Sequence, residues 1–136
     1  MTAEELRDSL YTNLASLLDT ESYPLIKITD AASERLADTM RNEKGVVVWI
    51  SKTSIRVPQK QVYKALYMAI GFNICVETNP QVENAPGYNE TLDAVIAAIL
   101  QIPRNTLGEF WTVYKAEEIA ESPGNGILTV LHPYQQ

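Results

Sequence analysis

The sequence predicts an α+β domain in which two main helices pack on one face of a mainly antiparallel sheet of about four strands. Two stretches, residues 6–18 and 92–100, carry an apolar stripe at helical spacing. Such a stripe has to be buried against another element, and a sheet supplies that surface. The predicted strands fall in runs and do not alternate strictly with helices, which favours α+β over α/β.

The longest predicted strand, residues 62–76, is the element around which the rest is organised. Its alternate positions are large and apolar with one exception: Val62, Lys64, Leu66, Met68, Ile70, Phe72, Ile74 and Val76. A period of two is typical of a strand with one buried face. At roughly 3.3 Å per residue the strand would be ~50 Å long, too long for a domain with a radius of gyration of about 14 Å. We therefore expect a bend or bulge, at Gly71, where no Cβ opposes it.

The N-terminal part predicts a helix, a short strand and a second helix. Thr2 and Glu5 have capping-box spacing at the start of the first helix, over residues 3–18. Residues 25–28, after Pro24, are strand-like. Asp30 is placed to cap the second helix, whose apolar face is thin, with only Ala32, Leu36 and Met40 spaced by four.

The middle of the chain predicts a hairpin. Residues 46–50 are apolar on both faces, as in a central strand, and residues 53–57 continue it after an irregularity. Pro58 ends the pairing, and the strand should return antiparallel as residues 62–76.

The C-terminal part predicts a helix and a second hairpin. Asn89 is placed to cap the helix after a loop over residues 79–87. A strand over residues 110–119 should direct Trp111 and Val113 to one face and Tyr114 to the other. The turn 122–126 leads to a last strand, residues 126–131, which Pro133 should stop.

One hydrophobic core is expected, because the two helix stripes have only the long strand face to cover. Its members should be Leu14, Leu66, Ile70, Phe72, Ile74, Val95, Ile96 and Ile99.

Length and composition predict a single domain spanning residues 1–136. No apolar run is long enough to span a membrane. The acidic start of the chain is unlike a secretory signal, so no targeting segment is expected. The net charge is −6, which repels phosphate, and the one cysteine, Cys75, fits a reducing cytoplasm.

Motifs for catalysis, cofactors or metals are not found in the sequence. His132 is the only histidine, Cys75 sits in mid-strand, and no Cys/His cluster has metal-ligand spacing. Glu117 and Glu118 are adjacent on a predicted strand, so their carboxylates should point to opposite faces. We therefore expect no enzyme, no catalytic residue, no cofactor and no metal.

A subunit interface is the one site that the residues suggest. Tyr63 and Tyr67 lie over small residues on the second face of the long strand, a composition that protein–protein surfaces use. The densest basic segment of this acidic chain runs alongside: Lys52, Arg56, Lys60 and Lys64. These six residues are the predicted interface. The alternatives are a sheet face half covered by a loop and a solvated basic loop.

The order and lengths of the elements resemble the tail terminator (tail completion) proteins of tailed bacteriophages, such as those of phages lambda and Mu. The matching pieces are the leucine-striped opening helix, the valine-rich strand 46–50, and the long strand ending Gly71-Phe72-Asn73-Ile74-Cys75-Val76. The helix 88–96 and the closing strands near 111–119 and 127–131 complete the match. Residues 30–40 do not clearly fit it.

The resemblance implies a non-enzymatic structural protein of the virion tail, assembled in the host cytoplasm. Such a protein forms a ring, typically a hexamer, that caps the tail tube, ends its polymerisation and meets the head–tail connector protein. Its partners would be its own copies, the tail tube protein and the connector, with no membrane. Genomic DNA would pass through the acidic lumen without specific binding. The alternative is a small, dimeric cytoplasmic α+β binding or regulatory domain.

Overall fold

The computed structural model describes residues 2–58 and 68–134. The helices of this part are α1 (Ala3–Leu17), α2 (Ala31–Lys44) and α3 (Tyr88–Gln101). Its strands are β1 (Leu25–Lys27), β2 (Val46–Pro58), β3 (Met68–Thr78), β4 (Thr112–Glu118) and β5 (Asn125–Tyr134). The strands form a five-stranded sheet in the order β1-β2-β3-β5-β4. The β1–β2 pair is parallel and the other pairs are antiparallel, so the predicted α+β class is confirmed, with one strand more than expected.

The first two helices begin with the side chains that the sequence indicates. The Thr2 hydroxyl accepts a hydrogen bond from the Glu5 amide at 3.1 Å, and the Glu5 carboxylate accepts one from the Thr2 amide at 3.3 Å. Asp30 and Ser33 form the equivalent box at the start of α2. This helix forms although Ala37 is the one residue in it that is buried. The expected cap at Asn89 is wrong. The N-cap is Gly87, two residues earlier, and α3 starts at Tyr88, because the Tyr88 ring packs closely against Gly126 of β5.

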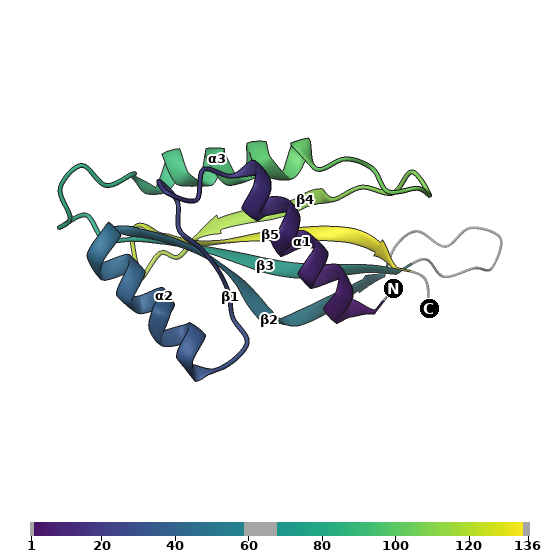
Figure 1. Cartoon of the computed structure of the whole chain (residues 1–136), viewed down its shortest axis with the longest axis horizontal. Coiled ribbons are helices and arrows are strands. Elements are labelled where there is room, and N and C mark those ends of the chain that lie inside the picture. The colour runs from purple at the N-terminus through teal and green to yellow at the C-terminus, as the bar shows by residue number, and fades with distance from the viewer. Residues whose placement is uncertain (1, 59–67, 135–136) are drawn as a thin grey trace.

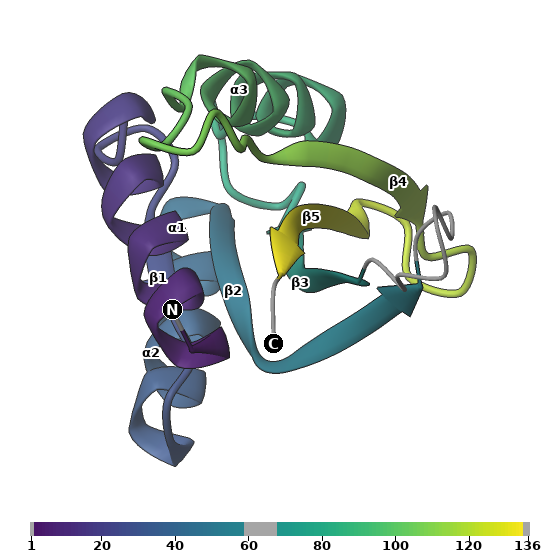
Figure 2. The same ribbon diagram turned by 90° about the vertical axis from the view of Figure 1, so that its right-hand side faces the viewer.

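Helices α1 and α3 cover the same face of the sheet, as predicted (Figures 1 and 2). We call it the inner face. The core between them includes Phe72, at 1% exposure, and Trp111, whose ring centroid is 6.1 Å from that of Phe72. Of the predicted core residues, Ile96 is only half-buried and Leu66 lies outside the described residues. The other predicted members are buried in this cluster: Leu14, Ile70, Phe72, Ile74, Val95 and Ile99.

Helix α2 packs on the opposite, outer face, over β1 and β2. Its contacts form a small second cluster in which Val47 is fully buried and Met40 and Trp49 are half-buried. The double-sided apolar character of residues 46–50 is thereby explained. Val46, Val48 and Ile50 face one layer of helices and Val47 faces the other. The sheet thus has helices on both faces, with the two main helices on one of them.

The expected bend or bulge at Gly71 is wrong, because Gly71 pairs regularly with Ile55 and Leu131 and the irregularity lies in the neighbouring strand. Ile50 pairs with Ile74 and Ser54 with Phe72, so β2 advances four residues while β3 advances two. Strand β2 curves strongly in Figure 2. Gly71 serves another purpose, since a Cβ there would lie 2.7 Å from side-chain atoms of both Ile55 and Leu131. Residues 62–67 of the predicted strand lie outside the described residues.

The C-terminal hairpin matches the prediction except at its end. Trp111 is buried, Val113 half-buried and Tyr114 53% exposed, as the alternation predicts. Strand β5 continues past Leu131 to Tyr134, so Pro133 does not stop it. Because β4 pairs no further than Leu131, β5 is an edge strand at Pro133, where a missing N–H is tolerated.

Candidate subunit interface

Two of the six predicted interface residues, Lys52 and Arg56, are described, and both are exposed on the second half of β2. The Arg56 guanidinium lies 5.1 Å from the centroid of the Tyr134 ring and donates a hydrogen bond of 3.0 Å to the Ser54 hydroxyl. The structure thus places these two basic residues on one strand. Lys60, Tyr63, Lys64 and Tyr67 lie outside the described residues, so the predicted interface as a whole stays a prediction.

A hollow of about 280 Å³ lies beside Lys52 and contains a buried cation, Arg7. Arg7 is 6% exposed, and its Nη1 donates to the carbonyls of Ile28 at 2.8 Å and Ser51 at 3.2 Å. Both carbonyls belong to the segments where β1 ends and β2 changes register. Arg7 therefore ties α1 to the sheet, and its chemistry there is structural.

The residues that the sequence singled out for chemistry are dispersed. The His132 ring packs 4.8 Å from Trp111, and its Nδ1 lies 2.9 Å from the Pro133 carbonyl. Burial, with a smaller contribution from the Glu77 charge, raises the pKa of the Cys75 thiol to about 12, so it is protonated at neutral pH. Within residues 2–58 and 68–134, no three His, Cys, Asp or Glu side chains are grouped to hold a metal ion.

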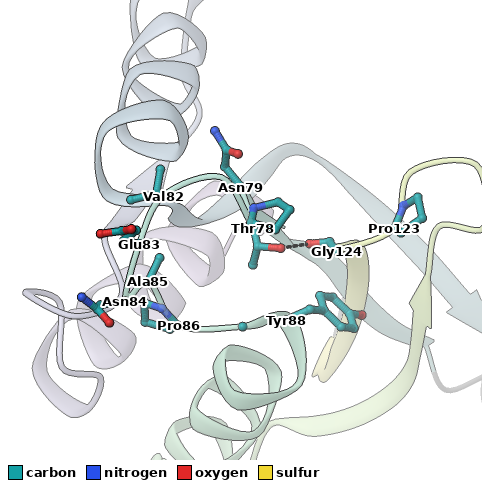
Figure 3. Close-up of a pocket in the computed structure, with 12 residues that line it drawn as sticks. Thr78, Asn79, Val82, Glu83, Asn84, Ala85, Pro86, Tyr88, Pro123 and Gly124 are labelled. Carbon is teal, nitrogen blue, oxygen red and sulfur yellow. Dashed lines mark hydrogen bonds between the residues drawn. The ribbon is translucent and has the colours of Figure 1, made fainter.

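A larger hollow of about 510 Å³ lies between residues 78–88 and the β4–β5 turn (Figure 3). The Thr78 hydroxyl donates a hydrogen bond of 2.7 Å to the Gly124 carbonyl and joins the two segments. Glu83 is the one charged residue among those described as lining it, and its side chain points away from Tyr88 in Figure 3. Loop side chains and backbone form this hollow, and apart from Glu83 its described lining offers hydroxyl and amide groups.

The first edge of the sheet, β1, lies in a groove between α1 and α2. The amide of Val48 donates to the carbonyl of Pro24, and the amide of Ile28 donates to the carbonyl of Ile50. In a parallel ladder this pattern directs the backbone groups of residues 25 and 27 away from β2. The groove has a volume of about 690 Å³, and six of the residues lining it are Tyr11, Ala15, Leu25, Leu36, Met40 and Lys44.

Leu36, Met40 and Lys44 follow one another at four-residue spacing along the groove side of α2. Leu36 is 46% exposed although it is large and apolar. The sequence contained this signal, as a thin stripe of Leu36 and Met40 on a polar helix. Its importance was missed, because the short strand beside it was not recognised as an edge of the sheet.

The second edge of the sheet, β4, is exposed along almost its whole length. Val113 is half-buried and the other residues of the strand are exposed. The Ile119 amide donates to the Asn125 carbonyl, and hydrogen-bonded pairs alternate along the strand from there, so the backbone groups of Ala116 and Glu118 point away from β5. The register shifts between Val113 and Lys115, which places Tyr114 in an irregularity of this edge. An unpaired edge of this kind is a template for another strand.

No described helix is both long and apolar enough to cross a membrane. Comparisons with protein-family models and with curated proteins find no match for this chain.

Proposed function

We propose that the protein is a structural component of a phage tail, which forms a ring on the end of the tail tube and stops its polymerisation. The proposal rests on the resemblance in order and length of elements to tail terminator proteins, and on one structural observation. The described sheet has two different unpaired edges, β1 and β4, at its two sides. A contact between two different surfaces joins copies head to tail, and it makes a ring when the rotation closes.

The ring would cap the tube with one face and meet the head–tail connector protein with the other. Its subunits carry a net charge of −6 each, so like charge favours the passage of DNA phosphate over its retention. The protein would act through its shape and its contacts, without catalysis. Assembly would take place in the host cytoplasm and the ring would remain in the virion.

The test combines native mass spectrometry with electron microscopy of tails. The expected species is a closed ring, with a mass about six times that of the 15.2 kDa chain if the ring is a hexamer. Added to polymerising tail tube protein of the same phage, the chain should give tubes of shorter and more uniform length. A stable dimer that leaves tube growth unchanged would contradict the proposal and favour a small dimeric binding or regulatory domain.

A further inference from the structure

We infer that the β4 edge of one copy adds to the β1 edge of the next copy, inside the groove between α1 and α2. This inference rests on the proposed ring and names the surfaces that would build it. The contact would extend the sheet from one subunit to the next by strand addition, in which main-chain hydrogen bonds bind and flanking side chains select the partner.

Strand direction favours this pairing. Strand β1 is parallel to β2, β2 and β5 are both antiparallel to β3, and β4 is antiparallel to β5. Strands β1 and β4 therefore run in opposite directions within one subunit. Copies in the same orientation then meet as antiparallel edges, and the inner faces of their sheets stay on the same side. Subunits of a cyclic ring have this common orientation.

The side chains of the two edges also match. On β4, Ala116 lies opposite the inward-facing Leu128, so in the contact it would lie under α1 of the next copy, near Tyr11. Glu117 lies opposite Ile127 and points to the outer face, so it would meet α2 of the next copy. Lys44 lines that side of the groove and forms no ion pair within the described part of the chain.

The antiparallel direction, together with a Glu117–Lys44 pair, sets the register of the inferred contact. Lys44 ends α2, which returns to the start of β1, whereas Leu36 lies nearer the other end of the groove. With Glu117 at Lys44, Tyr114 would be three strand residues away, about 10 Å, and Leu36 is eight helix residues away, about 12 Å. Residues three apart on a regular strand point to opposite faces, but the register of β4 shifts by one residue between Val113 and Lys115, which would return Tyr114 to the outer face beside Glu117. The exposed Tyr114 ring would therefore cover the exposed Leu36 side chain.

Cross-linking between two singly substituted chains tests the contact. Leu36→Cys and Tyr114→Cys are made separately in a Cys75→Ala background and treated with a short bismaleimide. Each variant alone should give no dimer, because the contact joins two different surfaces. Their mixture should give a cross-linked dimer, and the double variant should give a ladder of covalent oligomers that ends at the ring size.

Leu100→Cys paired with Tyr114→Cys is the matched control, because Leu100 is 70% exposed but lies on α3, away from the groove. This pair should not cross-link. A charge exchange provides a second readout: Lys44→Glu and Glu117→Lys should each weaken association several-fold, and the two together should restore it.

The outcomes separate the contact from the proposed function. Closed rings in the microscope without the Leu36–Tyr114 cross-link would overturn the contact and leave the ring intact. Cross-linking of either single variant to itself would also overturn it. A ladder from open chains that never close would support the contact and contradict the ring. A chain that stays monomeric even with tube ends present would contradict both.

Discussion

Arg7 donates a hydrogen bond of 2.8 Å from Nη1 to the backbone carbonyl of Ile28, just beyond the end of β1. The same nitrogen donates to the carbonyl of Ser51, where β2 leaves its first register. One buried cation thus satisfies two carbonyls that regular strand pairing does not reach. Arg7 thus adds two polar contacts to the apolar packing of Leu10 and Leu14 that holds α1, one wall of the β1 groove, on the sheet.

Replacement of Arg7 by alanine should lower the free energy of unfolding by about 2–3 kcal/mol, since it leaves buried carbonyls without donors. Urea denaturation followed by circular dichroism measures the loss. Arg35→Ala is the control, because Arg35 is exposed on α2 and its removal should change stability by less than about 0.5 kcal/mol. Equal effects of the two substitutions would contradict an anchoring role for Arg7.

Replacement of Phe72 by alanine should cost about 3–5 kcal/mol, the usual range for a buried phenylalanine. Its side chain is 1% exposed, and its ring packs against that of Trp111. The matched control is Phe110→Ala, because Phe110 is 42% exposed and should cost less than about 1 kcal/mol. A loss below that value for Phe72 in chemical denaturation would mean that the inner face has been assigned wrongly.

Gly45→Ala should destabilise the protein for two reasons. Its φ of +80° costs an L-residue about 1–2 kcal/mol. In addition, a Cβ would clash with the Cβ of Ala85 and lie 2.8 Å from that of Val82. Gly108→Ala isolates the backbone part, because Gly108 has a φ of +78° and no atom within 4 Å of the added Cβ. Thermal denaturation should show the larger loss of stability for Gly45→Ala. Equal losses for the two variants would show that residues 82–85 move aside at little energetic cost.

The Cys75 thiol should react slowly with Ellman's reagent in the native protein at pH 8 and rapidly in denaturant. Burial raises its pKa from 9.0 to about 12, so the reactive thiolate is scarce in the folded state. Between about pH 9 and 12 the unfolded thiol loses its proton before the folded one, so this group lowers stability as the pH rises. Cys75→Ala should lack that part of the pH dependence, and fast labelling of the native protein would contradict the burial.

The elements whose side chains alternate regularly could be predicted from the sequence. Both striped helices and the buried set on β3 follow directly from periodicities of 3.6 and 2, and the double-sided strand at 46–50 follows from its unbroken apolar run. The outward Tyr114 and the capping box at Thr2 also follow, because each depends on neighbours in sequence.

The remaining features depend on contacts between distant segments. Pairing of β1 with β2 sets the first edge of the sheet, and a three-residue strand gives no period to detect. The placement of α2 on the outer face follows from Val47 and Trp49, whose direction is fixed only when the register of β2 is known. The start of α3 at Tyr88 depends on its packing near Gly126, 38 residues later in the sequence. The β1 groove was missed for the same reason.

The register change in β2 implies that the curvature of this sheet is set by chain length. Over the paired segments, β2 has two residues more than β3. At about 3.3 Å per residue, these two residues add about 7 Å to the length of the β2 backbone. Because the surplus is an even number, the side chains of Val48 and Ile50 before it and of Ser54 after it face the same side of the sheet. A homologue that lacked both Lys52 and Thr53 would therefore retain the same faces on a straighter strand. The edge that this strand presents to β1 would stay in place, while its far end would point in a new direction.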